Sequence, residues 1–123
     1  MLDESKINHV TAEPGYHEWL AVIRDEKGSI LDTVSLGDLM VDYCDQIYNN
    51  GHPDIKDYAP DIIYHQAEDL VSAVDEQREE DGLYTLKDVL NEKQMTSLVE
   101  QIADVYYSGW QLVLNVQNKN ELS

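Results

Sequence analysis

The sequence is short of positive charge and of cysteine, and it contains no phenylalanine. Lysine and arginine together number 8, against 25 aspartates and glutamates, which gives a formal net charge of −17 at pH 7. Such a surface repels the phosphates of DNA, RNA and anionic membranes, so we expect no direct binding to these polyanions. The charge favours instead a basic partner, divalent cations or adaptation to a salty environment.

Other absences narrow the class of protein further. Cys44 is the only cysteine, so no disulfide can form within the chain. No stretch approaches the ~18 consecutive apolar residues of a membrane helix, and the start MLDESKINHV has neither the basic nor the apolar region of a signal peptide. These features predict a cytoplasmic protein. The isolated glycines form no phosphate-binding loop and no catalytic constellation is evident, so we expect neither an enzyme nor a cofactor.

The chain is long enough for one domain with a single core. It has 123 residues, of which 42% are hydrophobic, and these are spread along its whole length. We predict a single acidic domain over 1–123, with frayed ends at 1–6 and 118–123. Near its start, the runs 16–24 and 29–35 are rich in aromatic and β-branched residues and are separated by Asp-Glu-Lys-Gly, which predicts a β-hairpin.

Three helices are predicted after the hairpin. The first, 35–50, begins with a capping box formed by Ser35 and Asp38. The second, 61–80, has Pro60 at its first turn, where proline is favoured. The third, 85–108, begins with a second capping box and is interrupted near position 91.

A last strand is predicted at 110–117. Gly109 fits the residue that follows a helix, and Trp110, Leu112, Leu114 and Val116 then alternate with polar residues. The fold expected is therefore α+β, with an N-terminal β-hairpin, three helices, and a C-terminal strand that completes a small antiparallel sheet.

Acidic residues recur at helical spacing on all three predicted helices, and in 35–50 they fall opposite the apolar stripe. Along 61–80, one line holds Glu68, Asp75 and Glu79, and a second line lies beside it. Glu100 and Asp104 are also one turn apart. The acids that we predict to form a partner-binding surface are Asp38, Asp42, Asp45, Glu68, Asp69, Asp75, Glu76, Glu79, Glu80, Asp88 and Glu92.

The spacing of these carboxylates suggests a function. Like charges one helical turn apart destabilise a helix by a few tenths of a kcal/mol per pair, and few lysines are present to relieve this. One turn rises ~5.4 Å, so carboxylates on a rigid helix approximate the phosphates of a DNA strand, which rise ~3.4 Å each. This predicts a DNA mimic that occupies a basic DNA-binding cleft. The simpler alternative is that the acids form a solvated face.

Two stretches resemble segments of the Ocr-type antirestriction proteins of bacteriophages. One is NNGHPDIKDYAPDI (49–62), and the other is LKDVLNEKQMTSLVEQIADVYY (86–107). The residues that match the second family segment are Lys87, Asp88, Val89, Glu100, Gln101, Asp104 and Tyr106. Ocr-type proteins are small acidic dimers that mimic bent DNA and block type I restriction–modification enzymes. The resemblance therefore implies the same class of target, and it allows a homodimer.

The predicted fold departs from that family. Ocr-type proteins are mostly helical and have an acidic C-terminal tail, whereas this chain is predicted to contain strands and ends in NKNELS. A mixed α+β architecture is also common among small acidic anti-CRISPR proteins, which act on Cas nucleases. We therefore predict an acidic inhibitor of a restriction or Cas-type enzyme in a bacterial host, with no single named target.

Two other functions remain open. Tyr58, Tyr64 and Tyr107 could mark the partner surface of an adaptor, because tyrosine is enriched at interface hot spots. Alternatively, Asp61, His65 and Asp69 recur every fourth residue, a spacing that could hold a metal ion. A helix this rich in acid places a carboxylate beside almost any histidine by chance, so we predict no metal site.

Overall fold

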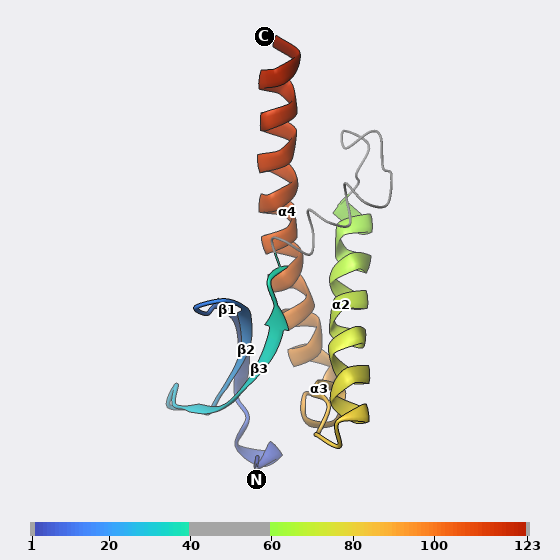
Figure 1. Cartoon of the computed structure of the whole chain (residues 1–123). Coiled ribbons are helices and arrows are strands. Elements are labelled where there is room, and N and C mark those ends of the chain that lie inside the picture. The colour runs from blue at the N-terminus through green and yellow to red at the C-terminus, as the bar shows by residue number, and fades with distance from the viewer. Residues whose placement is uncertain (1, 40–59, 123) are drawn as a thin grey trace.

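The computed structural model of the chain describes residues 2–39 and 60–122, and it describes side chains for 2–39 and 63–109. A short 3₁₀ helix, η1 (Glu4–Lys6), precedes a three-stranded antiparallel sheet, and the helices follow the sheet (Figure 1). The α+β class predicted from the sequence is confirmed.

The strands are β1 (His9–Pro14), β2 (Trp19–Arg24) and β3 (Ile30–Gly37), in the order β1-β2-β3. The predicted hairpin is confirmed as β2 and β3. Its turn is held by the carboxylate of Asp25, which accepts the main-chain N–H groups of Lys27 at 3.0 Å and Ser29 at 2.9 Å. Gly28 has φ 84°, in the left-handed region that favours glycine.

The sheet is completed by an N-terminal strand and not by the predicted C-terminal one. The strand predicted at 110–117 is wrong, because these residues lie within the long helix α4 (Glu92–Leu122). Because Leu112, Val113 and Leu114 are consecutive apolar residues, the run does not keep the strict alternation of a half-buried strand, and it can equally form a helix. Gly109 does not end α4 and is buried. A glycine within a helix costs about 1 kcal/mol, whereas extending an existing helix requires no new nucleation.

The predicted capping box at Ser35 and Asp38 is also wrong. β3 continues through Gly37, so Ser35 lies in a strand, and its hydroxyl donates a hydrogen bond to the carboxylate of Glu18. The rest of the predicted helix 35–50, including Asp42 and Asp45, lies outside the described residues.

The starts of the helices that follow agree with those predicted from the sequence. Helix α2 (Pro60–Glu80) begins at the proline, and α3 (Leu86–Val89) begins after a capping box formed by Thr85 and Asp88. Leu90 and Asn91 separate α3 from α4, which confirms the predicted interruption. None of the helices in 2–39 and 60–122 combines the length and apolar character needed to cross a bilayer.

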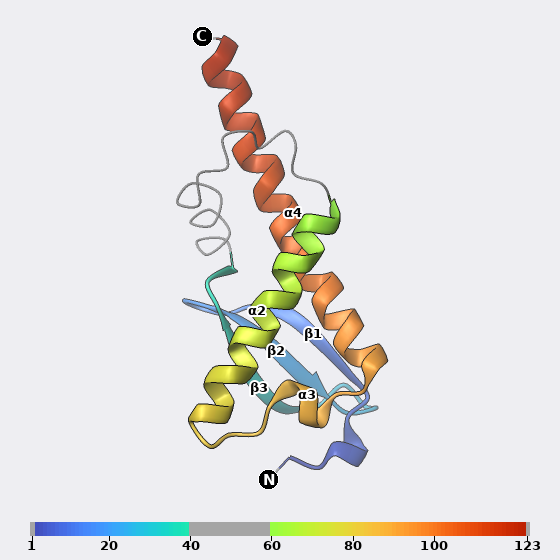
Figure 2. The same ribbon diagram turned by 90° about the vertical axis from the view of Figure 1, so that its right-hand side faces the viewer.

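Helices α2 and α4 run antiparallel, side by side, and cover one face of the sheet (Figure 2). The core forms between these two layers. α4 contributes Leu98, Ile102 and Tyr106, which are fully buried. The residues that meet them are Ile63, Ala67 and Val71 of α2, Val10 of β1, Ala21 and Ile23 of β2, and Val34 and Leu36 of β3.

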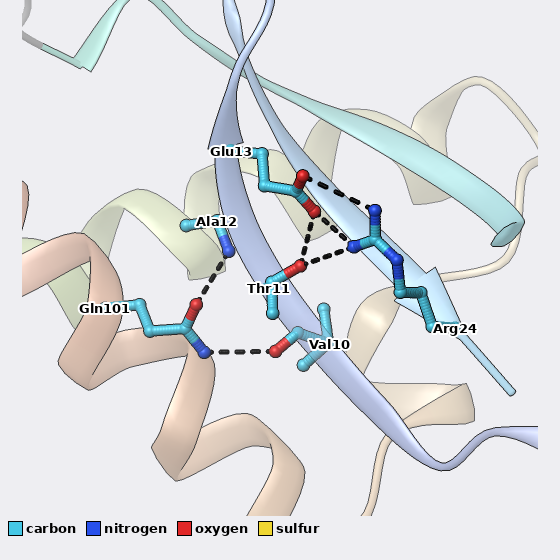
Figure 3. A network of polar contacts seen from close by, with 6 residues as sticks. All are labelled: Val10, Thr11, Ala12, Glu13, Arg24 and Gln101. Atoms are coloured by element: carbon cyan, nitrogen blue, oxygen red, sulfur yellow. Dashed lines mark hydrogen bonds and ion pairs between the residues drawn. The ribbon is translucent and has the colours of Figure 1, made fainter. Parts of the chain in front are cut away.

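Gln101 of α4 binds the free edge of β1 (Figure 3). Its side-chain oxygen accepts the main-chain N–H of Ala12 at 2.8 Å, and its Nε2 donates to the carbonyl of Val10 at 3.0 Å. The amide thus makes the pair of hydrogen bonds that another strand would make. Pro14, which lacks an N–H, ends the same edge strand.

An ion pair links β1 to β2, and it is also drawn in Figure 3. Arg24 of β2 donates to the carboxylate of Glu13, and Thr11 donates to the same carboxylate at 2.6 Å. The bonds from Arg24 and Thr11 lower the pKa of Glu13. Because this pair is partly exposed, solvent screens its attraction, but it occupies one of the few cations of the chain.

We predict that Gln101→Ala lowers the free energy of unfolding by about 1–2 kcal/mol, because two main-chain groups of β1 lose their partner. Gln101→Glu should also destabilise, since it sets a carboxylate against the carbonyl of Val10. Urea unfolding followed by circular dichroism measures both. Thr96→Ala, at an exposed position of the same helix, is the control. A wild-type urea midpoint for Gln101→Ala would show that these bonds add nothing.

Candidate partner-binding surface

The acids of α2 lie in two rows along the helix. We call Asp69, Glu76 and Glu80 the outer row, and Glu68, Asp75 and Glu79 the inner row. All three members of the outer row are exposed, whereas the inner row has a half-buried member at Asp75. The outer row lies on the side of the helix away from the apolar stripe, in which Ile63 and Val71 are buried.

Asp75 has a structural role that the sequence analysis missed. Its two carboxylate oxygens accept the main-chain N–H groups of Leu86 at 2.7 Å and Lys87 at 3.1 Å. These N–H groups belong to the first turn of α3, where a helix has no internal acceptors for them. Asp75 therefore ties α2 to α3, and it belongs to the scaffold of the surface as well as to the surface itself.

Asp88 also has a local structural role. Its main-chain N–H donates to the hydroxyl of Thr85 at 3.1 Å, and its carboxylate accepts the main-chain N–H of Thr85 at 3.3 Å. Hydrogen bonds from the side chain and main chain of Thr85 lower the pKa of Asp88. The carboxylate nevertheless stays exposed, so it still contributes charge to the surface.

The one arginine of α2 is engaged by the turn that follows the helix. Arg78 donates from Nε to the carbonyl of Tyr84 at 2.7 Å, and its guanidinium lies 4.6 Å from the centre of the Tyr84 ring. The Tyr84 hydroxyl in turn donates to Asp32 of β3. Burial, and then the bond to Asp32, raise the pKa of Tyr84. Arg78 therefore holds the α2–α3 turn to the sheet and does not neutralise the outer row.

An acidic hollow of about 410 Å³ lies between α2 and α3. It brings together four of the predicted acids, and one cation lies among its lining residues. The residues that line it are Ser72, Asp75, Glu76, Glu79, Leu83, Thr85, Lys87 and Asp88. The fold thus concentrates negative potential at the lower end of α2 in Figure 1.

The other predicted acids are more scattered. Glu92 is exposed in the first turn of α4, and Asp38 is exposed just after β3. Glu68 lies 3.2 Å from the ring of His65, one turn away on α2. Among the side chains that are described, no group of three or more His, Cys, Asp or Glu is placed to hold a metal ion.

A second depression lies between α2 and α4. We call it the tyrosine groove; it measures about 290 Å³ and is lined by Ile63, Tyr64, Glu100, Ala103, Asp104 and Tyr107. Tyr64 and Tyr107 are two of the three tyrosines predicted for the adaptor alternative, and the third, Tyr58, lies outside the described residues. Glu100 and Asp104 are not included in the predicted surface. The signal that could have found them is the one-turn spacing of the two acids beside Tyr107.

No protein-family model, curated protein or solved structure matches this chain.

We predict that Asp75→Asn lowers the free energy of unfolding by about 1.5–3 kcal/mol, because an amide can replace only one of the two charged acceptors. Glu76→Gln removes the same charge from the adjacent exposed position, and it should leave stability unchanged or slightly higher. Urea unfolding at neutral pH compares the two variants. Equal midpoints would contradict the capping role of Asp75.

Thr85→Val tests the capping box of Thr85 and Asp88 through the titration of Asp88. Because the folded-state pKa of Asp88 is lowered, the bond to Thr85 stabilises the fold at neutral pH. This contribution is lost as pH falls through that lowered pKa. In Thr85→Val the pKa of Asp88 should rise toward its ordinary value, which a carboxyl ¹³C NMR titration measures. An unchanged pKa would show that the hydroxyl is not the cause.

Proposed function

We propose that this protein is an acidic DNA mimic that occupies the basic DNA-binding cleft of a restriction or Cas-type enzyme and so excludes the DNA. The observation that carries the proposal is the lack of compensating arginine at the outer row. The chain has two arginines, and Arg24 binds Glu13 while Arg78 binds Tyr84. Among the described side chains, no lysine forms an ion pair with Asp69, Glu76 or Glu80 either, so the outer row remains available to an outside cation.

The geometry of α2 supports this proposal. The helix spans Pro60–Glu80, is fastened along its buried side to α4 and the sheet, and is tied by Asp75 to α3. Carboxylates on such a helix are held at fixed spacing, with one turn rising ~5.4 Å. A cleft that has evolved to contact phosphates gains the same release of counterions from a rigid row of carboxylates.

The resemblance to Ocr-type proteins supports the same class of target. In this proposal the protein acts in the cytoplasm of a bacterial host, binds no nucleic acid or membrane itself, and performs no catalysis. A homodimer is an additional proposal, derived from the resemblance alone. The partner is defined by its chemistry, as a cleft lined by lysine and arginine that normally holds duplex or displaced DNA.

The test is displacement of a labelled duplex from purified type I restriction enzymes and Cas nucleases, followed by fluorescence anisotropy. We predict displacement at stoichiometric concentration and a steep loss of inhibition as salt rises. The triple variant Asp69→Asn, Glu76→Gln and Glu80→Gln should inhibit at least about tenfold less well, whereas each single change should cost about threefold or less, because the field is shared.

The matched control neutralises Glu4, Glu18 and Glu26, which are exposed outside α2, α3 and α4. It changes the net charge by the same amount and should weaken inhibition by about twofold at most. Equal losses from the two triple variants would show that inhibition depends on net charge and not on the outer row. If every enzyme tested keeps its DNA, the proposal is overturned.

A second candidate function is an adaptor that binds its partner through tyrosines. It is favoured by one observation, the placement of Tyr64 and Tyr107 in one groove. In that case the outer-row triple variant would bind its partner as tightly as the wild type.

A further inference from the structure

The tyrosine groove combines apolar, aromatic and acidic groups from two helices. Ile63 and Ala103 supply apolar surface, and Tyr64 and Tyr107 supply aromatic rings, of which Tyr64 packs against the core. Tyr107 is 39% exposed, so part of its side chain faces the solvent. A groove built from two packed helices keeps its shape, because both helices are anchored by buried residues such as Ala67 and Ile102.

The acidic groups of the groove come from one face of α4. Glu100 and Asp104 are both exposed and lie one turn apart. Among the side chains that the structure describes, no lysine or arginine lies within ion-pair distance of either carboxylate. Aromatic rings such as those of Tyr64 and Tyr107 carry negative potential on their faces, which attracts a cation.

The size of the groove suits a side chain. Its volume of about 290 Å³ is room enough for one long side chain to lie along it. A planar guanidinium suits the groove better than a compact ammonium, because it stacks on aromatic rings and binds two carboxylate oxygens at once.

We infer that the tyrosine groove is a receptor for one arginine side chain of a protein partner. The arginine stem contacts Ile63 and Ala103, and its guanidinium lies between the tyrosine rings and the carboxylates of Glu100 and Asp104. This site goes beyond the proposed mimicry, because it recognises the shape of a guanidinium as well as its charge. It does not rest on that proposal, and its test uses a peptide instead of a DNA-binding enzyme.

The probe is the peptide acetyl-Gly-Arg-Gly-amide, titrated into the full chain and followed by NMR of the tyrosine ring and main-chain amide signals. Two peptides serve as comparisons. One replaces arginine with citrulline, which has nearly the same shape but no charge, and the other replaces it with lysine, which has the same charge. The arginine peptide should shift the signals of Tyr64 and Tyr107 saturably, the lysine peptide should bind several-fold more weakly, and the citrulline peptide should not bind.

Variants of the protein distinguish binding in the tyrosine groove from general electrostatic attraction to an acidic protein. Glu100→Gln with Asp104→Asn should weaken binding of the arginine peptide about tenfold. The control, Glu76→Gln with Glu80→Gln, removes the same charge from two exposed acids with the same spacing on α2, and it should weaken binding less than twofold. Tyr107→Leu should weaken binding several-fold, since it keeps the apolar contact but removes the ring.

Three results would overturn the inference. They are equal binding of the arginine and citrulline peptides, equal losses from the two double variants, and shifts that map away from the groove. The double variants change only exposed side chains, so their folding is checked directly from the dispersion of the amide spectrum. Because no DNA-binding enzyme is present, a failure here leaves the DNA-mimic proposal standing, and a success does not depend on it.

Discussion

The buried stripe of α4 is the constraint on which the rest of the structure depends. Leu98, Ile102 and Tyr106 are fully buried between the sheet and α2, so α4 holds the two layers together. Burial of each such side chain contributes about 1.5–3 kcal/mol, which exceeds the few tenths of a kcal/mol lost by each pair of like charges on a helix. The protein can therefore keep a net charge of −17 and still fold.

The two arginines of the chain lie where they stabilise the fold. Arg24 lies on the sheet with Glu13, and Arg78 lies over Tyr84 beside the turn between α2 and α3. Both fasten pieces of the fold together, and neither faces the outer row of α2. Arg78 thus supports the surface of α2 and α3 from within, while that surface presents negative charge outward; such an arrangement would complement the basic partner that we propose.

The sequence predicted those elements whose signals are local. Helix α2, the cap at Thr85 and the hairpin of β2 and β3 each carry their own periodicity or turn residues. The missed features depend on distant parts of the chain. β1 is short, and its edge is completed by Gln101, which lies 91 positions away from Val10. Likewise, Gly109 looked like a helix end, but it is buried within α4. For the surface, exposure of the outer row could be predicted from its position away from the apolar stripe of α2. The use of Asp75 as a cap could not, because its donors belong to α3.

Asp75 shows that the long-range attraction exerted by a carboxylate and its capacity for direct contacts are separate properties. Its charge acts over a distance and adds to the attraction felt by any approaching basic molecule. Both of its oxygens already accept a main-chain N–H, and the side chain is half-buried, so it has little left to offer once contact is made. In a complex, such a residue speeds association more than it prolongs residence. The lifetime of such a complex would then depend on the neighbouring acids, whose carboxylates are exposed to the solvent.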